Sequence, residues 1–244
     1  MPDQSTLAFV CAVPLECEPL AGLLAHAEQV VIGRKRAWWG TLDRRPVILL
    51  PAGMGKTNAA QGITALLEER EVGGVIGFGV GGAYPGAGLE VGDVALATRA
   101  VYGDEGVQTP AGWISTKEIG IPLLERGGAA TFNEIELDAA RVRRAGDALE
   151  RAGIRAVAGP FVTVSTCSGT AARGAELAAR FGAVCESMEG AALAHVAALY
   201  QCPYVEVRGI SNLVEDRDLA RWRLREAADA AQRAARAVAA GWGD

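Results

Sequence analysis

Residues 74–82 have the sequence Gly-Val-Ile-Gly-Phe-Gly-Val-Gly-Gly, an apolar run that ends in closely spaced glycines. A short continuous apolar run bounded by glycine is typical of a strand buried on both faces of a sheet. Glycine has no Cβ atom, so the backbone at this end can make a tight turn or approach a ligand closely. The stretch therefore predicts a central buried strand, over residues 74–78, with a candidate site at its carboxyl end.

Similar apolar runs alternate with segments of helical period on both sides of this strand. Strands are expected near residues 6–12, 30–42 (a hairpin), 46–50, 91–101, 161–165 and 203–210. Helices are expected near residues 14–25, after 57, near 137–152 and 170–181, after 187 and near 217–240. This order predicts an α/β fold with a central mixed β-sheet flanked by helices, in one domain over residues 1–244. Residues 104–133 fit neither pattern and predict a long surface excursion.

Composition excludes several classes of protein. The 244 residues are 50% hydrophobic, which is enough for a large buried core, and the net charge of -5 argues against a nucleic-acid partner. No apolar run approaches the roughly 20 residues that span a bilayer, and no signal peptide is evident, so we expect a cytoplasmic protein without a membrane partner. Five cysteines without a C-x-x-C pair, and only two histidines, argue against a disulfide framework or a metal site.

Polar residues at the junctions between predicted strands and helices are candidates for chemistry. Glu16 follows the first strand and could act as a general base if it is partly buried. Ser187 could cap a helix that has Glu189 in its first turn, where the dipole stabilises a carboxylate that can accept two ribose hydroxyls. Asn212 offers a donor and an acceptor on one planar amide, which suits the edge of a heterocycle. Each also has an ordinary structural explanation, as a solvated or capping carboxylate or a turn residue.

Gly53-Met-Gly-Lys-Thr57 invites comparison with a phosphate-binding loop. The required G-x-x-x-x-G-K-[ST] spacing is missing, because no glycine stands five residues before Gly55. The stretch does not predict a nucleoside triphosphate site, although a glycine turn that enters a helix can still present N–H groups to a ligand.

The order of these motifs resembles the purine nucleoside phosphorylase/nucleosidase superfamily over about residues 7–240. The resemblance rests on Glu16, Gly-x-Gly-Lys, Gly-x-Gly-Gly, Val91-Gly-Asp93, Ser187-Met-Glu-Gly-Ala and Val207-Arg-Gly-Ile-Ser-Asn212. Methylthioadenosine/S-adenosylhomocysteine nucleosidases are the general relatives that it resembles most. Residues 186–192 and 208–222 resemble futalosine hydrolases specifically, which release hypoxanthine in a menaquinone pathway.

The resemblance implies a role for particular residues. Glu16 matches the glutamate that activates the attacking water, and Met188 with Glu189 matches the pair that holds the ribose. Asn212 stands where nucleosidases usually have a purine-facing aspartate. Gly81 and Gly82, and more loosely Ser168, match residues that line the site. The resemblance also implies a small-molecule nucleoside substrate, no cofactor, and a homodimer or higher homo-oligomer.

Two departures from the family pattern bear on the reaction. Gly92 stands where bacterial-type phosphorylases carry a phosphate-binding arginine, which favours water over phosphate as the nucleophile. Asn212 in place of aspartate favours a 6-oxopurine such as hypoxanthine over adenine, because an amide can donate to O6. A methylthioadenosine-type nucleosidase, a true phosphorylase and a non-catalytic nucleoside-binding protein remain the alternatives. The carboxyphenyl end of futalosine would need a pocket, and the candidate cations for it, which the sequence does not rank, are Arg99, Lys117 and Arg217.

Overall fold

The computed structural model describes residues 5–243. Its strands are β1 (Leu7–Cys11), β2 (Ala25–Ile32), β3 (Lys35–Leu42), β4 (Arg45–Pro51), β5 (Gly74–Ala83), β6 (Val94–Tyr102), β7 (Gly106–Thr109), β8 (Gly112–Ser115), β9 (Leu124–Arg126), β10 (Ala129–Thr131), β11 (Glu134–Glu136), β12 (Ala156–Thr163), β13 (Cys185–Ser187) and β14 (Tyr204–Leu213). Its helices are α1 (Glu18–Ala21), α2 (Lys56–Glu69), α3 (Ala139–Arg151), α4 (Ala171–Phe181), α5 (Gly190–Leu199) and α6 (Leu224–Ala240), with short 3-10 helices η1 (Pro14–Glu16) and η2 (Leu219–Arg221).

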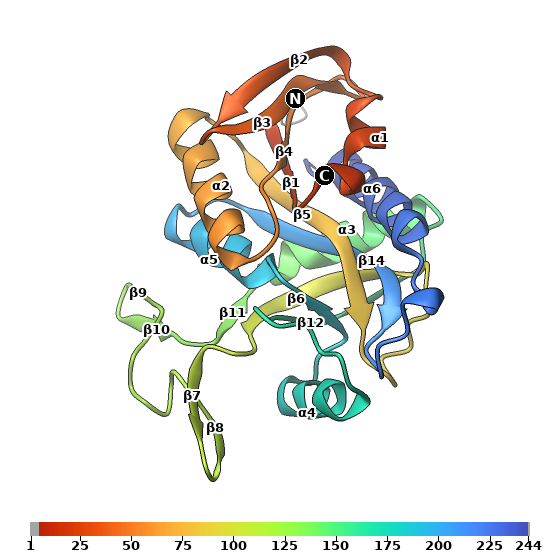
Figure 1. Ribbon diagram of the computed structural model, residues 1–244. Helices are drawn as coiled ribbons and strands as arrows, with labels where there is room; N and C mark the ends of the chain where they lie inside the picture. The colour runs from red at the N-terminus through yellow and green to blue at the C-terminus, as the bar shows by residue number, and fades with distance from the viewer. Residues whose placement is uncertain (1–4, 244) are drawn as a thin grey trace.

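The main strands form one mixed sheet, part of which closes on itself (Figure 1). The strand order is β11-β6-β12-β13-β5-β1-β4-β3-β2, and β14 pairs with both β5 and β6. Since β13 also joins β12 to β5, the strands β5, β14, β6, β12 and β13 make a closed ring. β1, β4, β5 and β14 run parallel, so their carboxyl ends meet at one edge of the sheet.

Helices cover both faces of this sheet, and the alternation of side chains along β1 shows why both faces are apolar. Ala8 and Val10 face the core under α2 and α5, which lie side by side in Figure 1. Leu7 and Phe9 face the opposite core, under α3 and α6. The fold-class prediction of a central mixed sheet flanked by helices is therefore confirmed.

The predicted bounds of individual helices and strands were less accurate than the predicted architecture. The helix expected over residues 14–25 is reduced to η1 and α1, and β2 already begins at Ala25. The strand expected over residues 74–78 continues as β5 as far as Ala83, because residues 79–83 pair with β14 and do not form a tight turn. The expected excursion carries two small hairpins, β7–β8 and β9–β10, which extend from the body in Figure 1. Within residues 5–243, no helix is long and apolar enough to cross a membrane.

Candidate active site

Glu16 lies at the end of η1, directly after β1, and is only 3% exposed. Its Oε2 accepts hydrogen bonds from the backbone N–H groups of Ala12 (2.8 Å) and Val13 (3.0 Å), and its Oε1 accepts one from Val80 (2.8 Å). Burial raises the pKa of Glu16 above its ordinary value, although Arg208 and the backbone donors oppose that rise. A carboxylate has about four acceptor sites, so three backbone donors leave capacity for one further donor such as water.

The glycine that makes room for this carboxylate is Gly79. A Cβ atom there would lie 2.5 Å from Oε1 of Glu16, and its φ of +155° is one that other residues rarely adopt. Gly81 and Gly82, the predicted lining residues, are needed for packing: a Cβ atom would lie 2.5 Å from Sγ of Cys185 in the first case and 2.9 Å from Val214 in the second. The glycines of this stretch therefore leave room for the Glu16 carboxylate and also allow neighbouring segments to pack closely.

Glu189 is the N-cap residue of α5, but its side chain bonds elsewhere. Its Oε1 accepts from the N–H of Gly55 (2.9 Å), in the turn that precedes α2, and its Oε2 accepts from Nη1 of Arg208 (3.3 Å). The prediction that Ser187 caps the helix is wrong, because Ser187 ends β13 and α5 begins at Gly190. The Glu189 carboxylate is thus held by the turn before α2 and by the guanidinium of Arg208, and it does not cap α5.

A buried guanidinium joins these parts. Arg208 is 1% exposed; its Nε donates to Glu206 (2.9 Å), and its Nη1 donates to the carbonyl of Val80 (3.2 Å) as well as to Glu189. Burial lowers the pKa of Arg208, but Glu206, Glu189 and Glu16 outweigh burial and raise it above its ordinary value. Arg208 therefore stays charged, next to Glu16 and in contact with Glu189, and fixes the distance between the strand end and α5.

The carboxyl end of β14 contributes Asn212. The pairing of β14 with β5 shifts register between Ile210 and Asn212, and a bulge of this kind re-aims side chains. Ser211 Oγ lies 3.2 Å from the carbonyl oxygen of Gly81 and 2.8 Å from Oδ1 of Asn212, so these two acceptors share its single proton, while Nδ2 of Asn212 donates to the carbonyl of Leu213 (3.0 Å). One N–H of the amide remains for a ligand, since an amide nitrogen carries two.

A cavity of about 280 Å³ opens beside Asn212. Ser168 lines it from the loop after β12, and Arg217 and Trp222 line it from the segment after β14. Ser168 is fixed by Glu186, which is 5% exposed and accepts from the backbone N–H of Ser168 (2.7 Å) and from its Oγ (2.6 Å). The predicted residues Ser168 and Asn212 thus share one cavity.

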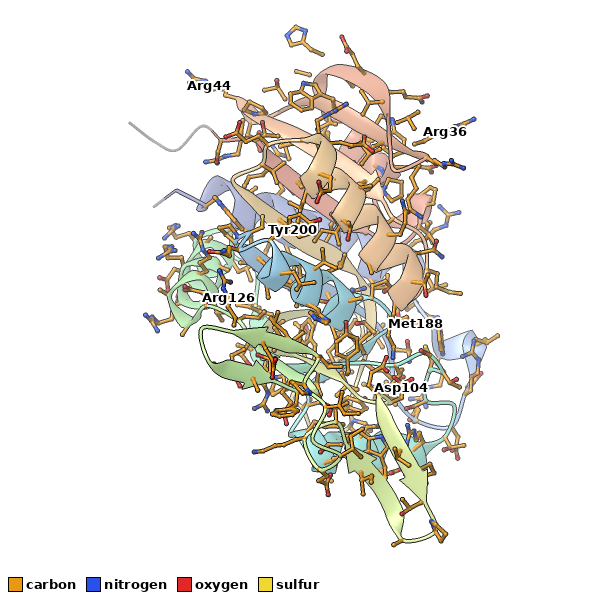
Figure 2. All side chains as sticks on the ribbon, turned by 90° about the vertical axis from the view of Figure 1, so that its left-hand side faces the viewer. Arg36, Arg44, Asp104, Arg126, Met188 and Tyr200 are labelled. Carbon is orange, nitrogen blue, oxygen red and sulfur yellow. The ribbon has the colours of Figure 1, made fainter. Side chains whose placement is uncertain are left out.

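The first residues of the surface excursion, Asp104 and Glu105, contact the start of α2 and the loop after β12. Lys56, the first residue of α2, pairs with Asp104 (2.5 Å) and Glu105 (2.8 Å), and Asp104 also accepts from the N–H of Ser165 (2.6 Å). Figure 2 shows Met188 and Asp104 on the same side of the molecule, near the start of α2. Asp104 therefore holds the loop after β12 and the start of α2 together beside Met188.

The sequence proposed Glu16, Glu189 and Asn212 as site residues, and the structure places them along neighbouring strand ends. Gly82, against Asn212, lies two residues along β5 from Val80, which bonds Glu16, a separation of about 7 Å. The organising residues Arg208 and Glu206 were given no role. The available signal was a charged pair within the mainly apolar first part of the strand Tyr204–Leu213.

The five cysteines differ in burial. Cys11, Cys17 and Cys185 are buried, Cys202 is half-buried, and Cys167 is exposed on the loop after β12. Within residues 5–243 all five thiols are free, and no cluster of three or more His, Cys, Asp or Glu side chains is arranged to hold a metal ion.

Comparison with known proteins identifies a family model and several curated relatives that match most of this chain. A family model described as the phosphorylase superfamily matches residues 6–240. A futalosine hydrolase of Thermus thermophilus is 33% identical over 83% of this chain and 85% of its own, and one of Streptomyces coelicolor is 36% identical over 73% and 72%. A 5'-methylthioadenosine/S-adenosylhomocysteine nucleosidase of Listeria welshimeri is 31% identical over 85% and 86%.

Solved structures share the fold. The 5'-methylthioadenosine/S-adenosylhomocysteine nucleosidase of Neisseria meningitidis, in complex with methylthio-immucillin-A, matches with a TM-score of 0.83. The match covers 96% of this chain and 98% of that one, at 22% sequence identity. At this identity the likeness shows a common architecture.

Replacing the buried guanidinium should destabilise the protein. Arg208→Met leaves the carboxylates of Glu206 and Glu189 without their partner, so we expect a loss of about 3–5 kcal/mol in the free energy of unfolding. Arg221→Met is the matched control, because it breaks an exposed pair with Glu215 and should cost about 0–1 kcal/mol. Urea denaturation of both variants measures the difference, and equal midpoints would contradict a structural role for the Arg208 cluster.

Proposed function

The chain belongs to the phosphorylase superfamily, and we propose that it hydrolyses the N-glycosidic bond of futalosine, giving hypoxanthine and dehypoxanthine futalosine for menaquinone biosynthesis. The observation that carries this proposal is the grouping of two buried carboxylates, Glu16 and Glu189, around Arg208, with Asn212 farther along the same sheet edge. Both carboxylates are needed for a nucleosidase: one to activate water, and one to hold the sugar.

Glu16 is suited to be the general base. Its backbone donors hold the carboxylate in place, and its raised pKa makes it a better proton acceptor than an exposed glutamate. In the reaction, the bond between C1′ and N9 breaks and its electron pair leaves with the purine. The oxygen of water joins C1′, one proton of that water passes to Glu16 and later to solvent, and the purine takes a proton from solvent.

Glu189 and Met188 are proposed to hold the ribose. The Glu189 carboxylate keeps acceptor capacity after its bonds to Gly55 and Arg208, so it can accept from vicinal hydroxyls. Its negative charge also stabilises the cationic, oxocarbenium-like sugar that forms as the bond lengthens. Met188 stands next to it and is half-buried, which suits contact with the apolar face of a ribose.

Asn212 is proposed to face the purine and to favour a 6-oxopurine. Its free N–H can donate to O6 or N7, whereas its Oδ1 already accepts from Ser211. An amide is a poor acid, so proton transfer to the leaving base is assigned to solvent. Gly81 and Gly82 are proposed to line the site beside Asn212. A side chain in place of Gly82 would put its Cβ atom 3.2 Å from Nδ2 of Asn212.

Water is favoured over phosphate by the surroundings of Gly92. Its φ is +93°, and a Cβ atom there would lie 2.9 Å from the carboxylate of Glu226. An arginine at this position would therefore need both a strained backbone and displacement of Glu226. The carboxylate would also repel a phosphate ion bound nearby.

A second candidate is a methylthioadenosine/S-adenosylhomocysteine nucleosidase, because relatives with that name match at nearly the same identity. The two reactions share the carboxylate pair and differ in the base that leaves. Asn212 is one feature of this chain that favours hypoxanthine over adenine. We further propose that the enzyme works without a cofactor, in the cytoplasm, as a homodimer or higher homo-oligomer; free thiols are typical of a reducing compartment.

A substrate panel tests the proposed function. Futalosine should release hypoxanthine, at a rate that does not depend on added phosphate, and methylthioadenosine should release adenine about 5- to 150-fold more slowly, since one mismatched buried polar contact costs about 1–3 kcal/mol. Released base is measured by chromatography, with and without phosphate. Faster release of adenine would assign the chain to the second candidate, and a requirement for phosphate would make it a phosphorylase.

Removal of the proposed general base, Glu16, should lower kcat. Glu16→Gln should lower kcat by about 10²–10⁴-fold, while Glu18→Gln, an exposed neighbour at the start of α1, should leave it unchanged. Because Glu16 must be ionised and burial raises its pKa, kcat/KM of the wild type should fall with decreasing pH already above 4.5. A near-normal kcat for Glu16→Gln, or an acid limb below pH 4.5, would remove Glu16 from this role.

A further inference from the structure

We propose that Arg217 and Ser168 form a two-point site for a 6-oxopurine, in which Arg217 donates to O6 and Ser168 accepts from N1–H. This inference rests on the proposed function and names the residues that choose the base. Both side chains line the cavity that also contains Asn212. With a volume of about 280 Å³, this cavity lies just below the range of about 300–1,000 Å³ for whole small-molecule sites, which suits a base better than a complete nucleoside.

Ser168 can offer only an acceptor to a ligand. Its hydroxyl proton and its backbone N–H are both directed to Glu186, at 2.6 and 2.7 Å. Tyr84 also donates to Glu186 (3.0 Å), and burial raises the pKa of Tyr84, so that hydroxyl remains a donor. A hydroxyl has one donor and two acceptor positions, so the lone pairs of Ser168 are what remains for the cavity.

Arg217 can offer only donors. Its guanidinium carbon lies over the ring of Trp222, 4.7 Å from the centroid, and its backbone N–H donates to the carbonyl of Gly169 (3.3 Å), next to Ser168. In the part of the chain that the structure describes, no carboxylate forms an ion pair with Arg217, whereas the neighbouring Arg221 pairs with Glu215. The cation–π contact holds a planar set of N–H donors at the wall of the cavity, and no carboxylate competes for them in an ion pair.

This pattern of a donor beside an acceptor fits one purine edge. Hypoxanthine presents O6, an acceptor, next to N1–H, a donor. Adenine presents the reverse at the same two atoms, a 6-amino donor next to the N1 acceptor. An adenine in this orientation would set its amino group against the donors of Arg217 and its N1 lone pair against that of Ser168, so both contacts would be lost together.

The charge around the cavity argues that Arg217 does not bind the carboxyphenyl end of futalosine. Glu90, Glu215, Asp216 and Asp218 line the same cavity, so its carboxylates outnumber its two arginines. Such a lining repels an anionic group but tolerates a neutral base. Of the other two candidates for the acid end, Arg99 pairs with Glu134 (2.9 Å), and Lys117 lies exposed in the excursion.

Arg217 also supplies a positive charge next to the leaving purine, which the neutral amide of Asn212 lacks. When the bond between C1′ and N9 breaks, the electron pair delocalises over the purine and places negative charge on O6. A guanidinium at O6 stabilises that charge without transferring a proton, and solvent protonates the base afterwards. Recognition of the base and stabilisation of its departure then depend on the same contact.

Binding of the free bases tests this site separately from catalysis. Isothermal titration should show that the wild type binds hypoxanthine more tightly than adenine. Arg217→Gln should weaken hypoxanthine binding by about 10- to 100-fold, Ser168→Ala by about 3- to 10-fold, and both should change adenine binding by less than threefold. Arg217→Lys, which keeps the charge but loses the planar donors, should give an intermediate value.

Arg221→Gln is the matched control, since it changes an arginine in the same lining that already has a partner. It should preserve the preference for hypoxanthine. Equal binding of the two bases by the wild type, unchanged hypoxanthine binding by a folded Arg217→Gln, or an equal loss in Arg221→Gln would overturn the two-point site. Failure of the wild type to cleave futalosine, with the base preference intact, would overturn the proposed function alone.

Discussion

The buried guanidinium of Arg208 is the interaction on which the site depends. It lies in contact with Glu206 and Glu189 and close to Glu16, so one cation serves three carboxylates that are each less than a tenth exposed. Without this cation, burial of so much negative charge would be strongly unfavourable. The excess of carboxylates keeps the Glu16 region electronegative, which suits a cationic sugar in the transition state.

The fold positions this cluster through close contacts between strands and α5. Glycine is required where the carboxylates approach the backbone: a Cβ atom on Gly79 would lie 2.5 Å from Glu16, and one on Gly190 would lie 2.4 Å from both carboxylate oxygens of Glu206. The ring of strands that β13 and β14 close brings the end of β14 beside β5. The bulge at Ser211 then aims Asn212 toward the cavity that Ser168 and Arg217 line.

Much of this arrangement was predictable from patterns in the sequence. Apolar runs predicted the main strands, and polar residues where strands meet helices marked Glu16, Glu189 and Asn212 as candidates. The apolar pattern predicted one helix over residues 14–25 but not its interruption, because Glu16 bonds back to the N–H groups of Ala12 and Val13 and the chain then turns into β2. Arg208 and Glu206 escaped notice because only three-dimensional pairing shows that two charges in one apolar strand satisfy each other and Glu189.

The most direct test of the account is a double-mutant cycle on kcat/KM for futalosine, with Glu16→Gln, Glu189→Gln and the double variant. Two carboxylates that act on one bound nucleoside should be strongly coupled, so the double variant should be little slower than the slower single variant. Independent effects that multiply, or a Glu189→Gln variant with the activity of the wild type, would show that the two side chains do not share a reaction centre.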